Sequence, residues 1–292
     1  MGPLLGRRLT PAAAVRLLVP ASLLVAGSSV FVLAVMAFTW IGQLPEVAEI
    51  GPWSGAMLRA SSPVPTGLAA FSGLLLVPAA VWALTLAARR GYAILAVHRS
   101  CRHLGTPGSL VVLDEERPDA FTTPELTGRI VVTTGLLNGL SADERRALLA
   151  HETSHLVHRH TWWVLAADLA GAINPLLRPT ARIVRHATER WADEDAACVV
   201  TDRALVARTV ARAALLQHRT PRRPAPIPAA TGGEVPRRVQ ALLAPRTRSR
   251  PVASALLTIL VATVVLAAAA VQHQGEELFE AAASGSHQPA QR

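Results

Sequence analysis

Residues 141–158 read SADERRALLAHETSHLVH, a stretch that carries the signals of a helix beginning at a capped residue. The Ser141 hydroxyl can accept a hydrogen bond from an amide of the first turn, and Glu144 can reach back to the cap. The pattern predicts a helix from Ser141 to about His158. Residues spaced i and i+4 on such a helix project from one face, with Cβ atoms about 5–6 Å apart.

The two residues with this spacing are His151 and His155, and Glu152 follows the first of them. Two imidazoles so placed can bind one Zn²⁺, and the glutamate can act as base on the attacking water. We therefore predict a catalytic zinc site with both histidines as ligands. His158 and His160 lie too far along the axis to share the ion, and we interpret them as polar surface residues or as supports behind a ligand.

A catalytic zinc site usually has three protein ligands, so a third must come from elsewhere in the chain. Thr161 stands where a metzincin would have its third histidine. Glu189 and Asp193 are spaced i and i+4 on another expected helix. We predict Glu189 as the third ligand, and Asp193 as the residue that holds a ligand imidazole through its second nitrogen. The candidates for an oxyanion donor are His186, Arg190 and His218.

Three long uncharged runs predict three transmembrane helices, at residues 17–41, 67–88 and 252–272. Each run is long enough to cross a bilayer, which takes about 20 apolar residues. A cleaved signal peptide is the alternative for the first run, but the apolar core of a signal peptide spans only about 7–15 residues. A lipid bilayer is therefore an expected partner.

The formal net charge is +9, and the chain contains arginine but no lysine. Arginines flank the apolar runs, at positions 7, 8, 16, 89, 90, 246, 248 and 250. This placement fits the positive-inside rule, and in the absence of a nucleic-acid motif we expect no direct nucleic-acid partner. Residues 89–251 are then cytosolic, with the first loop and the C-terminal tail outside. The predicted divisions are two spans and a loop (1–88), a peptidase domain (89–218), a flexible or extended Pro/Arg-rich linker (219–251), the third span (252–272) and a tail (273–292).

Two β-like runs, 109–113 and 129–133, precede the capped helix. The run IVVTTGLLNGLSADERRALLAHETSHLVHRH (130–160), followed by ATERWADEDAA (187–197), resembles the gluzincin membrane peptidases. It is similar to the BlaR1/MecR1-type family (M56) and to the related HtpX/Ste24-type peptidases (M48), over about residues 105–215.

The resemblance implies a mainly α membrane protein with a small β element and a cytosolic gluzincin-type zinc peptidase domain that binds one Zn²⁺ per chain. By that likeness His151, His155 and Glu189 are the ligands, Glu152 is the base, and Asp193 supports a ligand. Residues 118–123 (PDAFTT) resemble the strand-like stretch that lies along the substrate in such enzymes.

The sequence departs from both groups of relatives. HtpX-like proteins place two membrane passes between HExxH and the glutamate, whereas only 33 residues lie between His155 and Glu189 here, too few for two spans. We interpret the apolar run 162–177, which contains Asp168, as a core helix or a membrane-surface helix. BlaR1-like sensors carry a large extracellular penicillin-binding domain. This chain ends about 20 residues after its last apolar run, so we expect no β-lactam sensor role.

These features predict a zinc-dependent endopeptidase in the plasma membrane, a multi-pass protein that cleaves a protein or peptide substrate at the cytosolic face. By resemblance, the substrate is a transcriptional repressor or another regulator in signalling. Two alternatives are a quality-control protease for membrane proteins and a non-catalytic membrane scaffold or signalling subunit. The intact Glu152 argues against the scaffold, because binding alone does not need that base.

Overall fold

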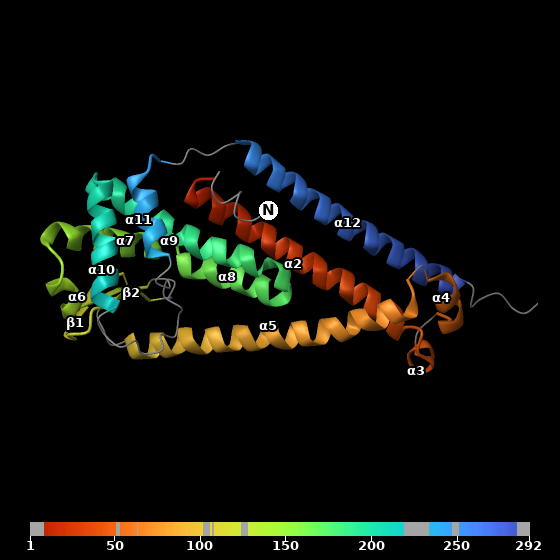
Figure 1. Cartoon of the computed structure of the whole chain (residues 1–292). Helices are drawn as coiled ribbons and strands as arrows, with labels where there is room; N and C mark the ends of the chain where they lie inside the picture. Colours follow the sequence, from red (N-terminus) through yellow and green to blue (C-terminus); the bar gives the residue numbers. More distant parts are fainter. Residues whose placement is uncertain are drawn as a thin grey trace, which may run out of the picture.

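The computed structural model describes residues 9–50, 53–62, 64–101, 106, 108–123, 128–218, 234–246 and 251–284. It is mainly helical and contains a small sheet, as the sequence predicts. Long helices run side by side through most of the molecule, and the sheet lies at one end with the shorter helices around it (Figure 1). The packing of these two parts against each other determines where the candidate site lies.

Two of the long helices, α2 (Pro11–Ile41) and α5 (Thr66–Cys101), are long and apolar enough to cross a membrane. α2 begins at Thr10, whose side chain accepts a hydrogen bond from the Ala13 amide. α5 continues several turns beyond the predicted end of its span at residue 88, so it reaches from the apolar half toward the sheet. The short helices α3 (Pro45–Ala48) and α4 (Gly55–Ser61) lie in the segment that joins α2 and α5.

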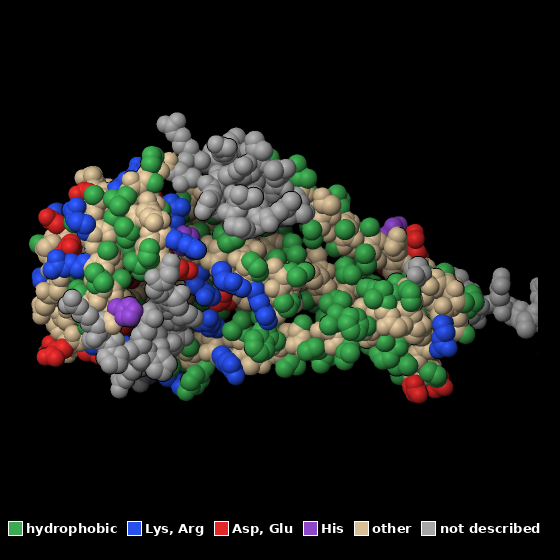
Figure 2. Space-filling view, viewed as in Figure 1, with side chains coloured by type: hydrophobic (Ala, Val, Ile, Leu, Met, Phe, Trp, Pro, Cys, Tyr) green, Lys and Arg blue, Asp and Glu red, His purple; other side chains and the backbone are tan. Residues whose placement is uncertain are grey.

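The third predicted span lies within helix α12 (Pro251–Ser284), which packs along α2 and ends near α4. Apolar side chains cover much of this half of the molecule, whereas arginine and acidic side chains gather at the sheet end (Figure 2). This division fits a membrane-embedded half and a water-facing half. Three spans and their orientation stay predictions, and the tail beyond residue 284 lies outside the described residues.

The sheet has the strand order β1 (Leu110–Leu113), β3 (Ile130–Thr133), β2 (Ala120–Thr122). β1 pairs with β3 in parallel and β2 pairs with β3 in antiparallel fashion. The central strand β3 is buried along its whole length, as its Ile-Val-Val sequence predicts. Both predicted β runs are confirmed, and β2 lies inside the PDAFTT stretch at an edge of the sheet.

Helix α7 (Ala142–Val157) follows the sheet after the short helix α6 (Thr134–Asn138). Both halves of the predicted capping box form, since Glu144 N donates to Ser141 Oγ and Ser141 N donates to Glu144 Oε2. The predicted helix is thus confirmed. Position 135, within α6, requires glycine, because a Cβ there would lie 1.8 Å from the Glu116 carbonyl oxygen.

The apolar run 162–177 forms helix α8 (His160–Ile173) and the short 3₁₀ helix η1 (Pro175–Leu177). α8 packs against α2, α5 and the next helix, α9 (Arg178–Val200). Whether it is a core helix or a membrane-surface helix stays a prediction. Its Asp168 is paired with Arg90 of α5 at 3.1 Å and with Arg185 of α9 at 2.7 Å. These ion pairs explain how a carboxylate is tolerated in an apolar run.

Residues 235–243, which we expected to be flexible or extended linker, instead form helix α11 (Val235–Leu243). α11 packs against α10 (Arg203–His218) and α9. Its Leu242 is buried with Ala196, Val206 and Ala207, and this apolar contact is what composition alone did not reveal. Within the rest of the predicted linker, residues 219–233 and 247–250 lie outside the described residues.

Candidate metal centre

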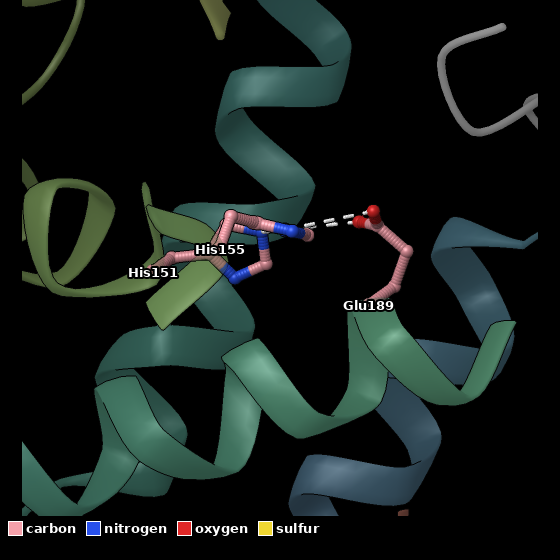
Figure 3. A group of neighbouring side chains, drawn as sticks. All are labelled: His151, His155 and Glu189. Atoms are coloured by element: carbon pink, nitrogen blue, oxygen red, sulfur yellow. Dashed lines mark hydrogen bonds and ion pairs between the residues drawn. The ribbon is translucent and has the colours of Figure 1, made fainter. Parts of the chain in front are cut away.

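Helices α7 and α9 pack together and bring the three predicted ligands to one point (Figure 3). His151 Nε2 and His155 Nε2 lie 3.1 Å apart. Glu189 Oε2 lies 3.8 Å from His151 Nε2, and Glu189 Oε1 lies 3.6 Å from His155 Nε2. The i and i+4 spacing on α7 and the approach of α9 therefore place three ligand atoms around one small space.

These distances fit a bound zinc ion. Zinc bonds of about 2.0–2.2 Å at tetrahedral angles would separate the ligand atoms by about 3.3–3.6 Å, and the observed separations of 3.1–3.8 Å bracket this range. His151, His155 and Glu189 also form a group with metal-ligand spacing among the described residues. The residues present thus suit the metal that the sequence predicts.

The Nδ1 atom of each ligand candidate imidazole also lies close to a polar side chain. His151 Nδ1 lies 3.1 Å from Asp193 Oδ1, although the ring is turned away from a linear hydrogen bond. His155 Nδ1 lies 3.0 Å from Nδ1 of His160, a residue with only 1% of its surface exposed. Arg159 has a φ of 53°, and this left-handed residue ends α7 and starts α8 so that His160 lies behind His155.

The Asp193 carboxylate beside Nδ1 favours one tautomer of His151. A carboxylate only accepts, so the proton of a neutral His151 belongs on Nδ1, and its Nε2 carries a lone pair. If His160 accepts from His155 in the same way, both Nε2 lone pairs face each other and the Glu189 carboxylate. Such a cluster of lone pairs is repulsive alone, and a cation between them makes it favourable.

Burial and neighbouring charges shift the pKa values of these histidines. Burial lowers the pKa of His155 well below its usual range, and the charges of His151 and Arg238 lower it further. Burial likewise lowers the pKa of His160, to about 2. Burial also acts to lower the pKa of His151, but the hydrogen bond and charge of Asp193 raise it above its ordinary value. His155 and His160 are therefore neutral near pH 7, as metal binding requires of His155.

Glu152, the predicted base, is buried beside the ligands with 8% of its surface exposed. The Thr122 hydroxyl of β2 donates to Glu152 Oε2 at 2.9 Å and orients the carboxylate. Burial raises the pKa of Glu152, while the charge of His151 and the Thr122 hydrogen bond act in the opposite direction. A carboxylate with a raised pKa is a better proton acceptor near neutral pH. The contact of Thr122 with Glu152 was not predictable from the sequence, which indicated only that Thr122 lies in the PDAFTT stretch.

Arg238 of α11 also enters the site, and the sequence did not indicate this. It contacts Asp193 through two hydrogen bonds, from Nε at 2.8 Å and from one terminal nitrogen at 2.6 Å. Its other terminal nitrogen donates to Glu189 Oε2 at 2.7 Å. Burial opposes ionisation of Asp193, but the charge of Arg238 holds the pKa of this carboxyl well below its usual range.

A cavity of about 720 Å³ opens beside the three ligand candidates. It is bordered by β2, the start of α8, and parts of α5 and α10, and Thr122, Glu152 and Arg238 line it. The three predicted oxyanion donors, His186, Arg190 and His218, are all described residues, and none of them lines this cavity. The structure thus brings together the predicted ligands and base but not these donors.

Residues 87–215, somewhat under half of the chain, match the model of peptidase family M48. The ligand candidates and Glu152 all lie inside the matched region. The match supports the resemblance to HtpX-like M48 peptidases and does not test the resemblance to the BlaR1/MecR1 type.

Three curated relatives show the same likeness over short regions. Protease HtpX of Legionella pneumophila is 45% identical over 75 residues, which cover 24% of this chain and 26% of that protein. The protease HtpX homologue of Acidiphilium cryptum is 44% identical over 71 residues, 23% of this chain and 24% of its own. That of Burkholderia mallei is 38% identical over 88 residues, 27% and 30% respectively. The chain thus spans 24–30% of the length of these relatives. No solved structure matched.

Proposed function

We propose that this chain is a membrane-bound, zinc-dependent endopeptidase. The observation that carries the proposal is the arrangement of His151, His155 and Glu189 around one point, with the buried Glu152 beside them. The M48 match and the HtpX relatives support the same class of protein. We propose His151, His155 and Glu189 as ligands of one Zn²⁺ per chain, and Asp193 as a support for His151.

A zinc ion held there supplies Lewis acidity, which activates water at neutral pH and polarises a carbonyl group. Glu152 accepts the proton of the water that adds to the scissile carbonyl carbon. It then delivers this proton to the leaving nitrogen as the C–N bond breaks. The Thr122 hydroxyl keeps Glu152 Oε2 oriented during both transfers.

The edge strand β2 is the proposed platform for the substrate. Residues 120–122 line the cavity, and β2 is an edge strand that pairs with β3 on one side. An extended peptide can add to such an edge by main-chain hydrogen bonds, which bind it without regard to sequence. This arrangement suits an endopeptidase that acts on an extended segment of a protein.

We further propose that the site faces the cytosol in a multi-pass plasma membrane protein. The support is the predicted topology, together with the gathering of charged side chains at the sheet end (Figure 2). The substrate is then a protein at or in the inner leaflet. A transcriptional repressor or other regulator is the candidate we favour from the resemblance, with misfolded membrane proteins as the alternative substrate class.

The test is the zinc content of the detergent-purified full chain, followed by hydrolysis of fluorescently labelled casein. We expect about one zinc per chain in the wild type and much less in His151→Ala and Glu189→Ala. Glu152→Gln keeps its zinc but loses hydrolysis by about 10²–10⁴-fold, because the proton acceptor is gone. Asp143→Asn, an exposed change on the same helix, is the control and retains both properties.

Two results would contradict this function. A wild-type chain without zinc, purified free of chelators, rules out the metal centre. A Glu152→Gln variant that cleaves casein as fast as the wild type rules out the proposed base. A scaffold that does no chemistry would show no hydrolysis at all and no consequence of the Glu152 change in cells.

A further inference from the structure

Arg238 contacts both Asp193 and Glu189 at the site. Its residue surface is only 7% exposed, and its three nitrogens all donate to Asp193 or Glu189. A buried guanidinium needs such partners, because removing it from water without them is costly. Here the five donors of its rigid fork match two carboxylates at once, which a lysine ammonium cannot do.

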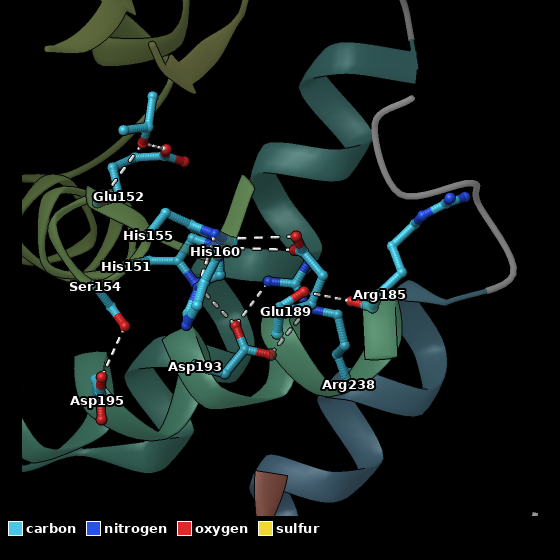
Figure 4. Close-up of polar contacts among 12 residues, drawn as sticks. His151, Glu152, Ser154, His155, His160, Arg185, Glu189, Asp193, Asp195 and Arg238 are labelled. Carbon is cyan, nitrogen blue, oxygen red and sulfur yellow. Dashed lines mark hydrogen bonds and ion pairs between the residues drawn. The ribbon is translucent and has the colours of Figure 1, made fainter. Parts of the chain in front are cut away.

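The contacts determine how each carboxylate is turned. Arg238 binds Glu189 through Oε2, which leaves Oε1 facing His155 Nε2 at 3.6 Å. It binds both oxygens of Asp193, and the Oδ1 atom so fixed is the one that lies 3.1 Å from His151 Nδ1. Arg238 thus contacts one ligand candidate directly and a second through Asp193 (Figure 4).

The rest of α11 holds Arg238 at this position. Leu242 is 2% exposed in a cluster with residues of α9 and α10. At the C-terminal end of α11, Arg203 of α10 donates to the carbonyl oxygens of Ala241, Leu242 and Ala244 at 2.8–3.2 Å. These contacts satisfy carbonyl groups that a helix end leaves without partners. The helix is therefore anchored independently of the site.

We propose that Arg238 is the positioning residue of the metal centre, holding Glu189 and, through Asp193, His151 in the orientations that bind zinc. This inference rests on the proposed function, since it presupposes that these side chains bind the metal. It extends the site to a helix that lies outside the region matched to the M48 family.

Charge and geometry make opposite predictions for the loss of Arg238. Removing a positive charge next to two carboxylates makes the site more negative, so electrostatics alone predicts tighter zinc binding. Removing the residue that turns both carboxylates predicts weaker binding, because residues behind metal ligands typically contribute about 10–100-fold in metal affinity. The sign of the change therefore tests the proposal.

The experiment is a competitive zinc titration with a chromophoric chelator on the detergent-purified full chain. We expect Arg238→Met to bind zinc about 10–100-fold more weakly than the wild type. Arg238→Lys, which keeps the charge but not the fork, binds more weakly as well. Arg237→Met removes the same charge from an exposed position on the same helix and retains wild-type affinity.

Cobalt(II) at saturating concentration provides a readout that a purely structural role would not change. Its visible spectrum depends on the number and geometry of ligands, and we expect an altered spectrum in both Arg238 variants. Thermal unfolding of the metal-free proteins shows which variants are folded. If Arg238→Met does not fold, Arg238→Lys is used for the zinc titration and the cobalt spectrum instead. Unchanged or tighter zinc binding in a folded Arg238→Met overturns the proposal, and wild-type affinity in Arg238→Lys overturns the role of the fork. Absence of zinc in the wild type would instead refute the metal centre itself.

Discussion

His160 shows how a single side chain can prepare a ligand from behind. Its Nδ1 lies 3.0 Å from His155 Nδ1, and burial lowers the pKa of His160 so that its ring is neutral and can accept a hydrogen bond from His155 Nδ1–H. Holding the proton at Nδ1 leaves Nε2 of His155 free for the metal. The contact depends on the left-handed turn at Arg159.

We therefore predict that His160→Phe lowers zinc affinity by about 10–100-fold, because a ring of similar size remains but its acceptor is lost. The measurement is the same chelator competition on the purified chain. His158→Phe is the matched control, since the rings of His158 and His160 both contact Trp191, but His158 contacts Asp195 and not a ligand candidate. Equal affinities of the two variants would contradict this role.

Residues that act through local spacing were predictable, and residues that act through distant contacts were not. The i and i+4 spacing predicted the pairs His151/His155 and Glu189/Asp193, because residues with this spacing share a helix face wherever the helix lies. Arg238 stands 49 residues after Glu189 in a Pro/Arg-rich segment, so nothing local distinguishes it from the arginines around it. The oxyanion candidates were chosen by residue type alone, and none of them lines the cavity.

At the scale of the helix, α7 depends on how its first turn is closed. Ser141 and Glu144 each satisfy a backbone amide that the helix start leaves without a partner. α7 carries both histidines and Glu152, so its start sets the position of the site along the axis. The capping box was predictable because it lies within four consecutive residues.

We predict that Ser141→Ala destabilises the chain by about 1 kcal/mol, within a range of about 0.5–2, because one capping hydrogen bond is lost. Thermal or denaturant unfolding of the zinc-free protein in detergent measures this loss. Ser61→Ala is the control, since it removes an exposed hydroxyl that donates to Met57 O at the end of another helix. A stability equal to that of the wild type would show that Glu144 alone closes the turn.

Helix α11 illustrates why an element can be missed although its neighbours are found. Its nine residues include the run Pro236-Arg237-Arg238, which has the Pro/Arg-rich composition of the predicted linker. Isolated helices of this length are marginal in water and gain stability from packing. The packing partners of α11 lie on α9 and α10, and the sequence does not show which segment will cover them.

On the scale of the whole molecule, the long helices and the site are joined by specific contacts. Arg16 of α2 lies 4.8 Å above the ring of Trp191, which is on the helix that carries Glu189. Asp168 of α8 pairs with Arg90 of α5 and with Arg185, one turn before Glu189. The apolar half and the site therefore form one packed unit, and the side of the membrane that the site faces follows from how α2 and α5 are oriented.

The arginine distribution predicts that the site faces the cytosol, and the two cysteines of the chain allow a direct test. Cys198 is exposed on α9, so in a Cys101→Ser variant it is the single thiol, on the predicted inner side. A membrane-impermeant maleimide applied to intact cells should leave it unlabelled and should label it after permeabilisation. Ala56→Cys in a chain without the native thiols reports on the loop at α4 and should be labelled in intact cells. Labelling of Cys198 in intact cells would contradict the predicted orientation and place the site on the extracytoplasmic side. The substrate would then have to be sought among extracytoplasmic proteins.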